Sequence, residues 1–185
     1  MVLGALIVII LVAVVAFVLI YNSLVALKKR VENAWAQIDV QLKRRADLIP
    51  NLIETVKGYA KFEKKVLTEV TEARTAVMTA KSPKESAKAE NMLTGALKTI
   101  FAVAEAYPTL KASENFKSLQ EEFSSTENKI AYARQFYNDT VMQFNTVIAQ
   151  FPSNFVAGMM GYKDKEFFEA EEAEKKVVKA DFSDL

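Results

Sequence analysis

The chain has 185 residues, of which 51% are apolar and 25% are charged, and its formal net charge is +1. A net charge near zero gives no global field that attracts nucleic acid, and the absence of cysteine excludes disulfides, thiolate nucleophiles and cysteine zinc sites. Histidine is absent too, so Ser-His, Cys-His and zinc-hydrolase mechanisms are excluded.

The first element is an apolar run. Residues 2–21 read VLGALIVIILVAVVAFVLIY, and no charged side chain occurs before Lys28. A helix of about 20 residues spans roughly 30 Å, the thickness of a hydrocarbon core, and satisfies its own backbone there. A cleaved signal peptide is the rival interpretation, but the run is too long and lacks a basic start and an Ala-x-Ala cleavage site. The sequence therefore predicts a transmembrane anchor over residues 1–21.

Three basic residues, Lys28, Lys29 and Arg30, follow this run directly, and none precedes it. The positive-inside rule predicts a single-pass protein of the cell membrane, with the N-terminus outside and the remainder cytoplasmic. On a helix these residues lie roughly 10–13 Å beyond the span, where each contributes up to about 1 kcal/mol to contact with anionic headgroups. They are the predicted membrane-surface residues, and the lipid membrane is the first predicted partner.

Residues 22–80 are predicted to form one long helix with a kink at Pro50, which lacks an N–H and clashes with the carbonyl of Ala46. A stripe of apolar residues recurs with a spacing near 3.5, which indicates a seam buried against other helices. Arg45 interrupts the stripe and is expected to pair with a carboxylate inside the bundle. The stripe comprises Val31, Trp35, Ile38, Leu42, Arg45, Ile49, Leu52, Val56, Tyr59, Glu63, Val66, Val70, Ala73 and Val77.

The same periodicity predicts two further long helices. The run Ser82-Pro83-Lys84-Glu85 is typical of a capping box with proline at the first helical position, and Pro108 ends the helix that it starts. A third helix opens at Thr109 or Ser113 and runs to about Gln150. Its stripe, expected to be core, comprises Phe116, Leu119, Phe123, Thr126, Ile130, Ala133, Tyr137, Thr140, Phe144, Val147 and Phe151.

Only short elements are predicted after the third helix. One or two turns are expected over residues 155–160, and Asp164 is expected to cap a short last helix through about Lys176. Residues 177–185 are predicted to be an extended tail. The predicted fold class is all-α: a transmembrane helix continuing into an antiparallel up-and-down bundle over residues 22–176, with three long helices and a short fourth.

The run AWAQIDVQLKRRADLIPNLIETVKGYAKFE, residues 34–63, resembles the signature of the LemA family. Residues 21–25 and the pair Ala73-Arg74 also fit that family's pattern, and residues 167–169 and 178–182 fit it loosely. The resemblance covers nearly the whole chain and implies a membrane-anchored helical bundle. It implies no activity, because the family has no agreed biochemical function, although some relatives are associated with membrane remodelling in magnetosome formation.

The membrane-proximal part of the stripe is a candidate interaction surface. The second helix returns only about 36 Å, whereas the first extends roughly 88 Å beyond the membrane, so part of the stripe is expected to lack a cover from the second helix. An uncovered apolar stripe would mark an interface with another copy, a membrane partner or the chain's own tail, whereas packing inside the monomer is the favoured interpretation. The predicted interaction residues are Val31, Trp35, Ile38, Leu42, Arg44 and Arg45.

The leading functional hypothesis is a membrane-anchored scaffold or adaptor that presents a cytoplasmic helical bundle to an unidentified membrane or cytoplasmic protein. The alternative is a structural protein that remodels membranes by self-assembly as a homo-oligomer. No enzymatic activity, catalytic residue, cofactor or metal site is predicted, because no motif points to one. Nucleic-acid and nucleotide binding are disfavoured, since the five glycines are scattered and no binding motif is present.

Overall fold

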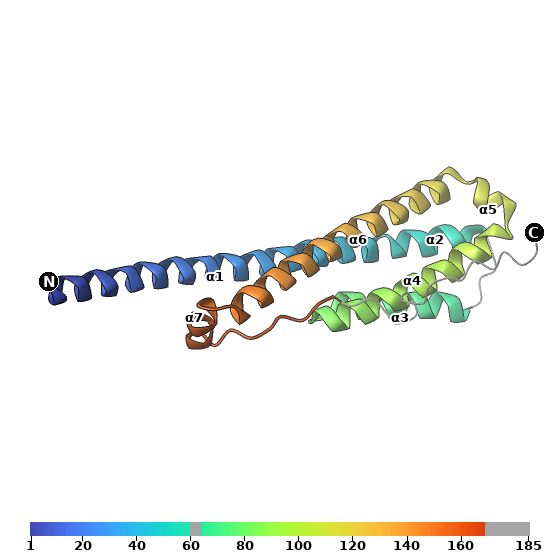
Figure 1. Cartoon of the computed structure of the whole chain (residues 1–185). Coiled ribbons are helices and arrows are strands. Elements are labelled where there is room, and N and C mark those ends of the chain that lie inside the picture. The colour runs from blue at the N-terminus through green and yellow to red at the C-terminus, as the bar shows by residue number, and fades with distance from the viewer. Residues whose placement is uncertain (60–63, 169–185) are drawn as a thin grey trace, which may run out of the picture. The chain divides into compact units, whose positions relative to one another are not determined.

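The computed structural model describes residues 1–59 and 64–168, and within these the chain is helical without strands (Figure 1). The all-α class is confirmed, and so are a long apolar N-terminal helix and a helical bundle arrangement. The predicted tail, residues 177–185, and the end of the predicted last helix lie outside the described residues. The helices are α1 (Val2–Asp47), α2 (Ile49–Tyr59), α3 (Lys64–Thr79), α4 (Pro83–Glu105), α5 (Pro108–Ala112), α6 (Glu114–Ala149) and α7 (Ser153–Met159).

The chain forms two compact units. The first combines Met1–Asp39 with Ala131–Phe167, and the second combines Phe168 with the described residues between Val40 and Ile130. Two helices, α1 and α6, contribute to both units, because each unit boundary falls inside them. The other helices belong to one unit each: α7 to the first, and α2, α3, α4 and α5 to the second.

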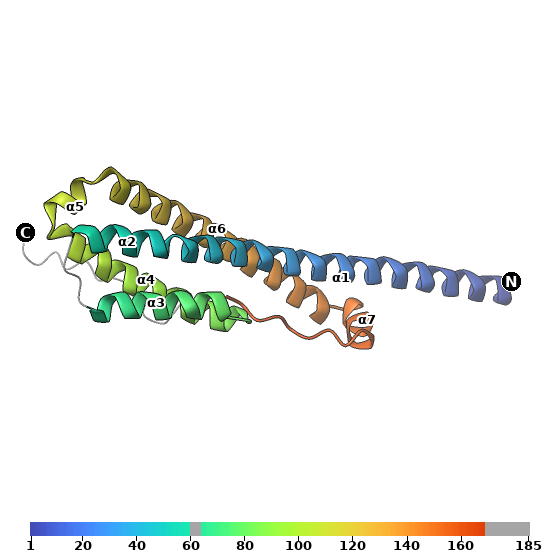
Figure 2. The same ribbon diagram turned by 180° about the vertical axis from the view of Figure 1, so that it is seen from behind.

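In the first unit the character of α1 changes within one helical turn. Residues 1–19 are all exposed, and none of the most apolar 18-residue window is buried. Tyr21 is still 42% exposed, whereas Leu24 has no exposed surface. The C-terminal half of α6 lies beside α1 beyond this point, as Figure 2 shows, and the Trp35 and Tyr137 rings are in contact there. The buried part of α1 therefore begins directly after the apolar run, and no linker separates the two parts of the helix.

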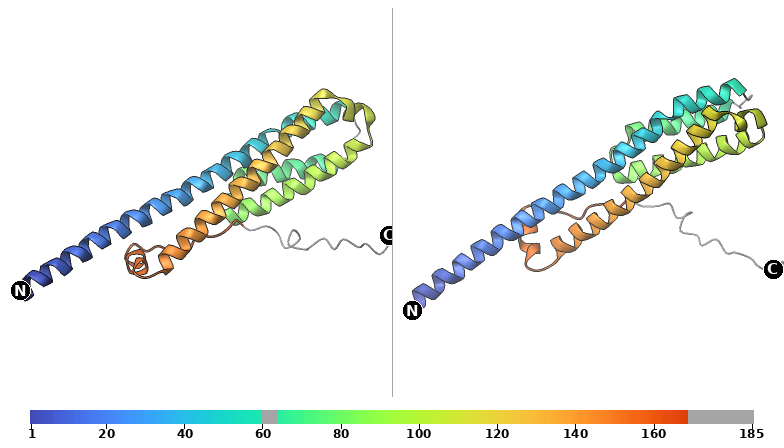
Figure 3. Two further views of the ribbon diagram at one scale, coloured as in Figure 1. Left: turned by 45° about the horizontal axis from the view of Figure 1, so that its top comes forward. Right: turned by 90° about the horizontal axis from the view of Figure 1, so that it is seen from above.

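In the second unit the chain reverses direction between α2 and α3, which Figures 1 and 3 show running antiparallel. The Arg74 Nε donates a hydrogen bond to the Ala46 carbonyl at 3.0 Å, although the two residues would lie about 42 Å apart on one straight helix. The predicted single helix over residues 22–80 is therefore wrong. α3 packs along α4, and α5 contacts both α2 and α4.

Pro50 lies in the first turn of α2, and α1 ends three residues before it at Asp47. The expected interruption is thus a one-residue break at Leu48, whose N–H bonds the Arg45 carbonyl at 3.3 Å. A residue at position 50 would normally donate its N–H to the Ala46 carbonyl, and proline has none to give. The Arg74 guanidinium supplies a donor to that carbonyl from α3 instead.

Replacing Arg74 by methionine is expected to lower the free energy of unfolding by about 1–3 kcal/mol, because the Ala46 carbonyl loses its side-chain donor. In a Pro50→Ala background the same replacement is expected to cost less. The alanine has a backbone N–H, which can donate to the Ala46 carbonyl in place of Arg74. Denaturant titration of the four proteins measures this difference. Arg44→Met is the control, because Arg44 is exposed. Equal costs in both backgrounds would contradict the pairing.

The start of α4 has one of the two bonds of the predicted capping box, and the second is shifted by one residue, from the N–H of Ser82 to that of Lys81. Ser82 Oγ accepts a hydrogen bond from the Glu85 N–H at 3.2 Å, and Glu85 Oε2 accepts one from the Lys81 N–H at 2.8 Å. Pro83 is the first helical residue, as expected. The ensuing apolar stripe is buried, and its fully or nearly buried members are Ala89, Leu93, Ala96, Leu97, Ile100 and Ala104.

The third predicted helix is α6, preceded by the short α5 that the sequence did not indicate. Its stripe is largely buried, but Phe151 is 80% exposed because α6 has already ended at Ala149. The turns expected over residues 155–160 are α7. The helix expected from Asp164 does not form within the described residues, since residues 162–168 are non-helical.

Candidate functional site

The membrane-proximal unit is the candidate functional site, and a tight turn after α7 shapes it. Gly161 has a φ of +65°, a conformation that glycine adopts without a steric penalty. Its N–H donates to the Gly158 carbonyl at 3.1 Å, and the Tyr162 N–H donates to the Ala157 carbonyl at 3.0 Å. This pair of bonds is the Schellman motif, which ends α7 and turns the chain back along α6.

Two side chains of α6 hold the returning segment by its backbone. Asn145 donates through Nδ2 to the Lys165 carbonyl at 3.0 Å and accepts the Lys165 N–H through Oδ1 at 2.8 Å. The Tyr137 hydroxyl donates to the Glu166 carbonyl at 2.8 Å. These bonds occupy backbone groups that a helix from Asp164 would need, which explains why the segment is extended instead.

Tyr137 is protonated when it makes this bond. Burial raises the pKa of Tyr137 above its ordinary value of 10.0, and the Glu166 carboxylate acts in the same direction. A raised pKa in the folded protein means that folding favours the neutral hydroxyl. The resulting stabilisation is fully present below about pH 10 and is lost as the pH rises above the tyrosine pKa of the unfolded chain.

Replacing Asn145 by alanine is expected to cost about 1–3 kcal/mol, since both hydrogen bonds to Lys165 are lost at once. The amide of Lys165 is then expected to exchange its hydrogen faster, and hydrogen-exchange mass spectrometry measures that rate. The control is Gln143→Ala, because Gln143 is exposed on the same helix. Unchanged exchange in the Asn145 variant would show that other contacts hold the segment.

The three predicted membrane-surface cations lie on this unit. The Lys28 ammonium is 5.5 Å from the centre of the Tyr162 ring, and the Arg30 guanidinium is 5.8 Å from that of Phe136. Lys29 pairs with Glu32 at 2.7 Å, which raises the pKa of the lysine and lowers that of the glutamate. Lys29 and Arg30 are exposed, and their contact with lipid headgroups stays a prediction.

The predicted interaction stripe is covered within the chain. Val31 is 4% exposed, Ile38 has no exposed surface and Leu42 is 2% exposed. Trp35 is half-buried and meets the Tyr137 ring edge-on, with centroids 5.7 Å apart. The stripe is therefore packed within the chain, which was the favoured interpretation, and in the first unit the cover is the C-terminal half of α6. Binding of a partner by this set stays a prediction.

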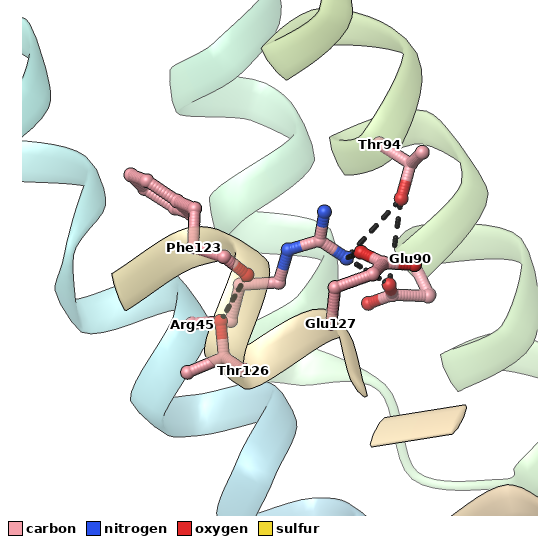
Figure 4. A network of polar contacts seen from close by, with 6 residues as sticks. All are labelled: Arg45, Glu90, Thr94, Phe123, Thr126 and Glu127. Atoms are coloured by element: carbon pink, nitrogen blue, oxygen red, sulfur yellow. Dashed lines mark hydrogen bonds and ion pairs between the residues drawn. The ribbon is translucent and has the colours of Figure 1, made fainter. Parts of the chain in front are cut away.

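Arg44 and Arg45 are neighbours in α1 with opposite surroundings. Arg44 is exposed, whereas Arg45 is 4% exposed inside the second unit. The Arg45 Nη1 pairs with the Glu90 carboxylate of α4, which is 2% exposed, and with Glu127 Oε2 of α6 at 2.6 Å (Figure 4). It also donates to Thr94 Oγ1 at 3.2 Å. Arg45 thus has the carboxylate partner that the sequence predicts: Glu90 is the buried partner, and Glu127 is a second one.

This network joins three helices and serves packing. Thr94 donates to Glu90 Oε1 at 3.4 Å, and Thr126 donates to the Phe123 carbonyl at 2.8 Å beside it. Arginine suits such a site because it stays charged, and its Nη1 atom alone contacts Glu90, Glu127 and Thr94. Within residues 1–59 and 64–168 no cluster of three or more acidic, histidine or cysteine side chains is arranged to hold a metal ion.

The exposed apolar face at α7 is a feature of the first unit that was not predicted from the sequence. Phe151 is 80% exposed, Phe155 is 67% exposed and Met159 is 78% exposed. The signal was available, because the three residues recur at i, i+4 and i+8 beside a proline and two glycines. That spacing indicates one face of a short helix that ends soon after it starts.

These features define a class: an all-α bundle protein with one N-terminal helix that is a candidate membrane span. The family model of the LemA family matches residues 34–182, and the chain belongs to that family. The protein is similar to protein LemA of Metamycoplasma hominis, with 30% identity over 168 residues that cover 89% of this chain and 74% of that protein.

Magnetosome proteins are also among the relatives. Magnetosome protein MamQ 2 of Paramagnetospirillum magneticum is 26% identical over 199 residues, which cover 91% of this chain and 73% of the relative. Magnetosome protein MamQ of Magnetospirillum gryphiswaldense is 24% identical over 174 residues, which cover 80% of this chain and 64% of the relative. The similarity therefore extends over most of the chain in each comparison.

Proposed function

We propose that this LemA-family chain is a single-span scaffold or adaptor that presents its helical bundle to protein partners at the cytoplasmic face of the membrane. One observation carries the proposal: α1 is a continuous helix whose exposed apolar run passes directly into a buried core face at Leu24. A span that continues into the bundle without a linker holds the bundle at a fixed height above the lipid. Such placement suits the positioning of partners.

Orientation is the second part of the proposal. Lys28, Lys29 and Arg30 follow the apolar run, and the positive-inside rule favours their cytoplasmic location. The buried charges support a structural role, because Arg45 is neutralised by the buried Glu90 and by the partly exposed Glu127. A buried pair of this kind specifies packing and leaves partner binding to exposed residues such as Arg44.

Cysteine labelling tests the anchoring and the orientation together. Because the chain has no cysteine, Lys84→Cys creates one label site on the exposed first turn of α4. A membrane-impermeant maleimide is expected to label it only after spheroplasts are permeabilised, and the protein is expected to stay with membranes after alkaline extraction. Labelling of unopened spheroplasts would contradict the cytoplasmic orientation, and extraction at alkaline pH would contradict the span.

Self-assembly at the membrane is the second candidate function, favoured by the similarity to magnetosome proteins over 91% of the chain. The two functions predict different behaviour in mild detergent. A scaffold is expected to run as one small species whose size does not change with concentration. An assembly that remodels membranes is expected to form large, concentration-dependent polymers. Light scattering across a dilution series distinguishes them.

A further inference from the structure

α7 and Phe151, two residues before its start, present an apolar face that the described part of the chain leaves uncovered. Phe151, Phe155 and Met159 are spaced four residues apart, and each is more than 60% exposed. The Phe151 and Phe155 rings meet edge-on with centroids 6.0 Å apart. The opposite side of α7 is anchored, since Val156 is 5% and Ala157 is 2% exposed. The short helix is therefore amphipathic, with its larger side chains directed away from the packed unit.

This face lies close to the end of the candidate membrane span. Tyr162 follows α7 through the Schellman turn, and its ring lies 5.5 Å from the Lys28 ammonium. Lys28 is seven residues beyond Tyr21, or about 10 Å along a helix. Figures 1 and 2 show α7 at the end of α6 nearest the apolar part of α1. The burial of Leu24, one turn past Tyr21, agrees with this placement.

We propose that α7 and the turn before it form a membrane-contact element, in which Phe151 of the turn and Phe155 and Met159 of α7 insert into the boundary between headgroups and acyl chains of the leaflet from which α1 emerges. This inference rests on the proposed function, because it requires the apolar run of α1 to span a bilayer. Continuity with the span selects lipid as the occupant. A helix lying in the interface buries its apolar face about 5–10 Å deep, within reach of this position.

The residue types fit that environment. Aromatic side chains prefer the interfacial region, and methionine adapts to irregular apolar surroundings. Basic residues beside α7, Lys28 and Lys163, are placed to meet anionic headgroups while the apolar face enters the lipid. Contact through both α1 and α7 would fix the rotation of the first unit about the α1 axis, which a single span leaves free.

Spin labels in proteoliposomes test the proposal. Single cysteines replace Met159 and, as the aqueous control, Tyr132, which is 75% exposed on α6 of the same unit. The full-length variants are reconstituted in equal parts of phosphatidylcholine and phosphatidylglycerol, and the accessibility of each label to oxygen and to a water-soluble nickel chelate is measured. The oxygen-to-nickel ratio is expected to be severalfold higher at Met159 than at Tyr132. Both positions are exposed, so neither variant is expected to unfold.

Ile10→Cys in the apolar run separates this inference from the proposed function. A lipid-like ratio at Ile10 with a Tyr132-like ratio at Met159 would overturn the α7 contact and leave the span intact. Water-like ratios at both positions would overturn the span itself. Shielding of Met159 from both reagents, with dipolar broadening from a second label, would show that another copy covers the face and would overturn the lipid contact.

Discussion

Replacing Arg45 by methionine is expected to lower the free energy of unfolding by about 3–5 kcal/mol. The guanidinium sits at 4% exposure among α1, α4 and α6, and it neutralises Glu90, whose exposure is 2%. Without Arg45 the Glu90 carboxylate stays in a low-dielectric interior beside an apolar side chain, or it must take up a proton. Either outcome raises the free energy of the folded state relative to the wild-type protein, in which Arg45 neutralises Glu90.

The double variant Arg45→Met with Glu90→Leu distinguishes the cost of lost packing from the cost of a buried, unpaired charge. Glu90→Leu alone is expected to cost about as much as Arg45→Met, while the double variant is expected to approach the wild-type stability, since both charges are then gone. Chemical denaturation followed by circular dichroism measures all four proteins in the same detergent. Glu127→Gln is the control and is expected to cost less than about 1 kcal/mol, because the Glu127 side chain is 47% exposed. Additive costs of the two replacements would contradict a coupled pair.

Replacing Phe144 by alanine is expected to destabilise the first unit by about 3–5 kcal/mol, because a large buried ring leaves a cavity. Phe144 has no exposed surface, and its ring lies 5.8 Å from that of Tyr162. The loss is expected to reach the segment after α7, which Tyr162 begins. Thermal unfolding measured by circular dichroism shows the change, and hydrogen exchange localises it.

A matched replacement on the same helix provides the control. Tyr132 is 75% exposed, so Tyr132→Ala is expected to change the free energy of unfolding by no more than about 0.5 kcal/mol. A similar cost for both replacements would show that α6 contributes through helix propensity and not through the packing of its buried side.

Helix faces were predictable from the sequence, whereas chain direction was not. The stripe of buried residues includes Ile49, Leu52, Val70 and Ala73, as the spacing near 3.5 indicated. The spacing of the stripe continues from α2 to α3, with Glu63 as an interruption, and it therefore predicts one helix although the chain reverses. The bond between the Ala46 carbonyl and Arg74 forms only when α3 folds back, and it joins residues too distant in sequence for the spacing of the stripe to reveal it.

The sequence is sufficient to predict that the third helix covers the membrane-proximal stripe. A third helix of about 38 residues is roughly 57 Å long, enough to pass the second helix and reach Val31. A comparison of the first helix with the second alone leaves this cover by the third helix out of account. The helix predicted from Asp164 failed for another reason: Asn145 and Tyr137 bind the backbone of the segment, and no local pattern reports bonds from residues so distant in sequence.

Arg45 shows how much a sequence reveals about a buried charge. A single arginine on an apolar stripe indicates a carboxylate partner, and the structure supplies Glu90. The partner itself was not predictable, because several glutamates on the later helices have suitable spacing and only the packing of α4 against α1 selects among them. The stripe of α6 does not reveal the exposed face at α7, because Phe151 continues that stripe in register and so hides the end of that helix.

A spin-label scan along α1 in proteoliposomes tests the central claim that one helix serves as both span and core element. Single cysteines are placed at successive positions over residues 6–38, and oxygen and nickel accessibilities are measured at each. Labels at 6–18 are expected to be uniformly open to oxygen and closed to nickel. From 22 onward both accessibilities are expected to alternate with the helical period, with minima at Leu24, Val31 and Ile38. Helical alternation over 6–18, or nickel access throughout that run, would contradict the claim.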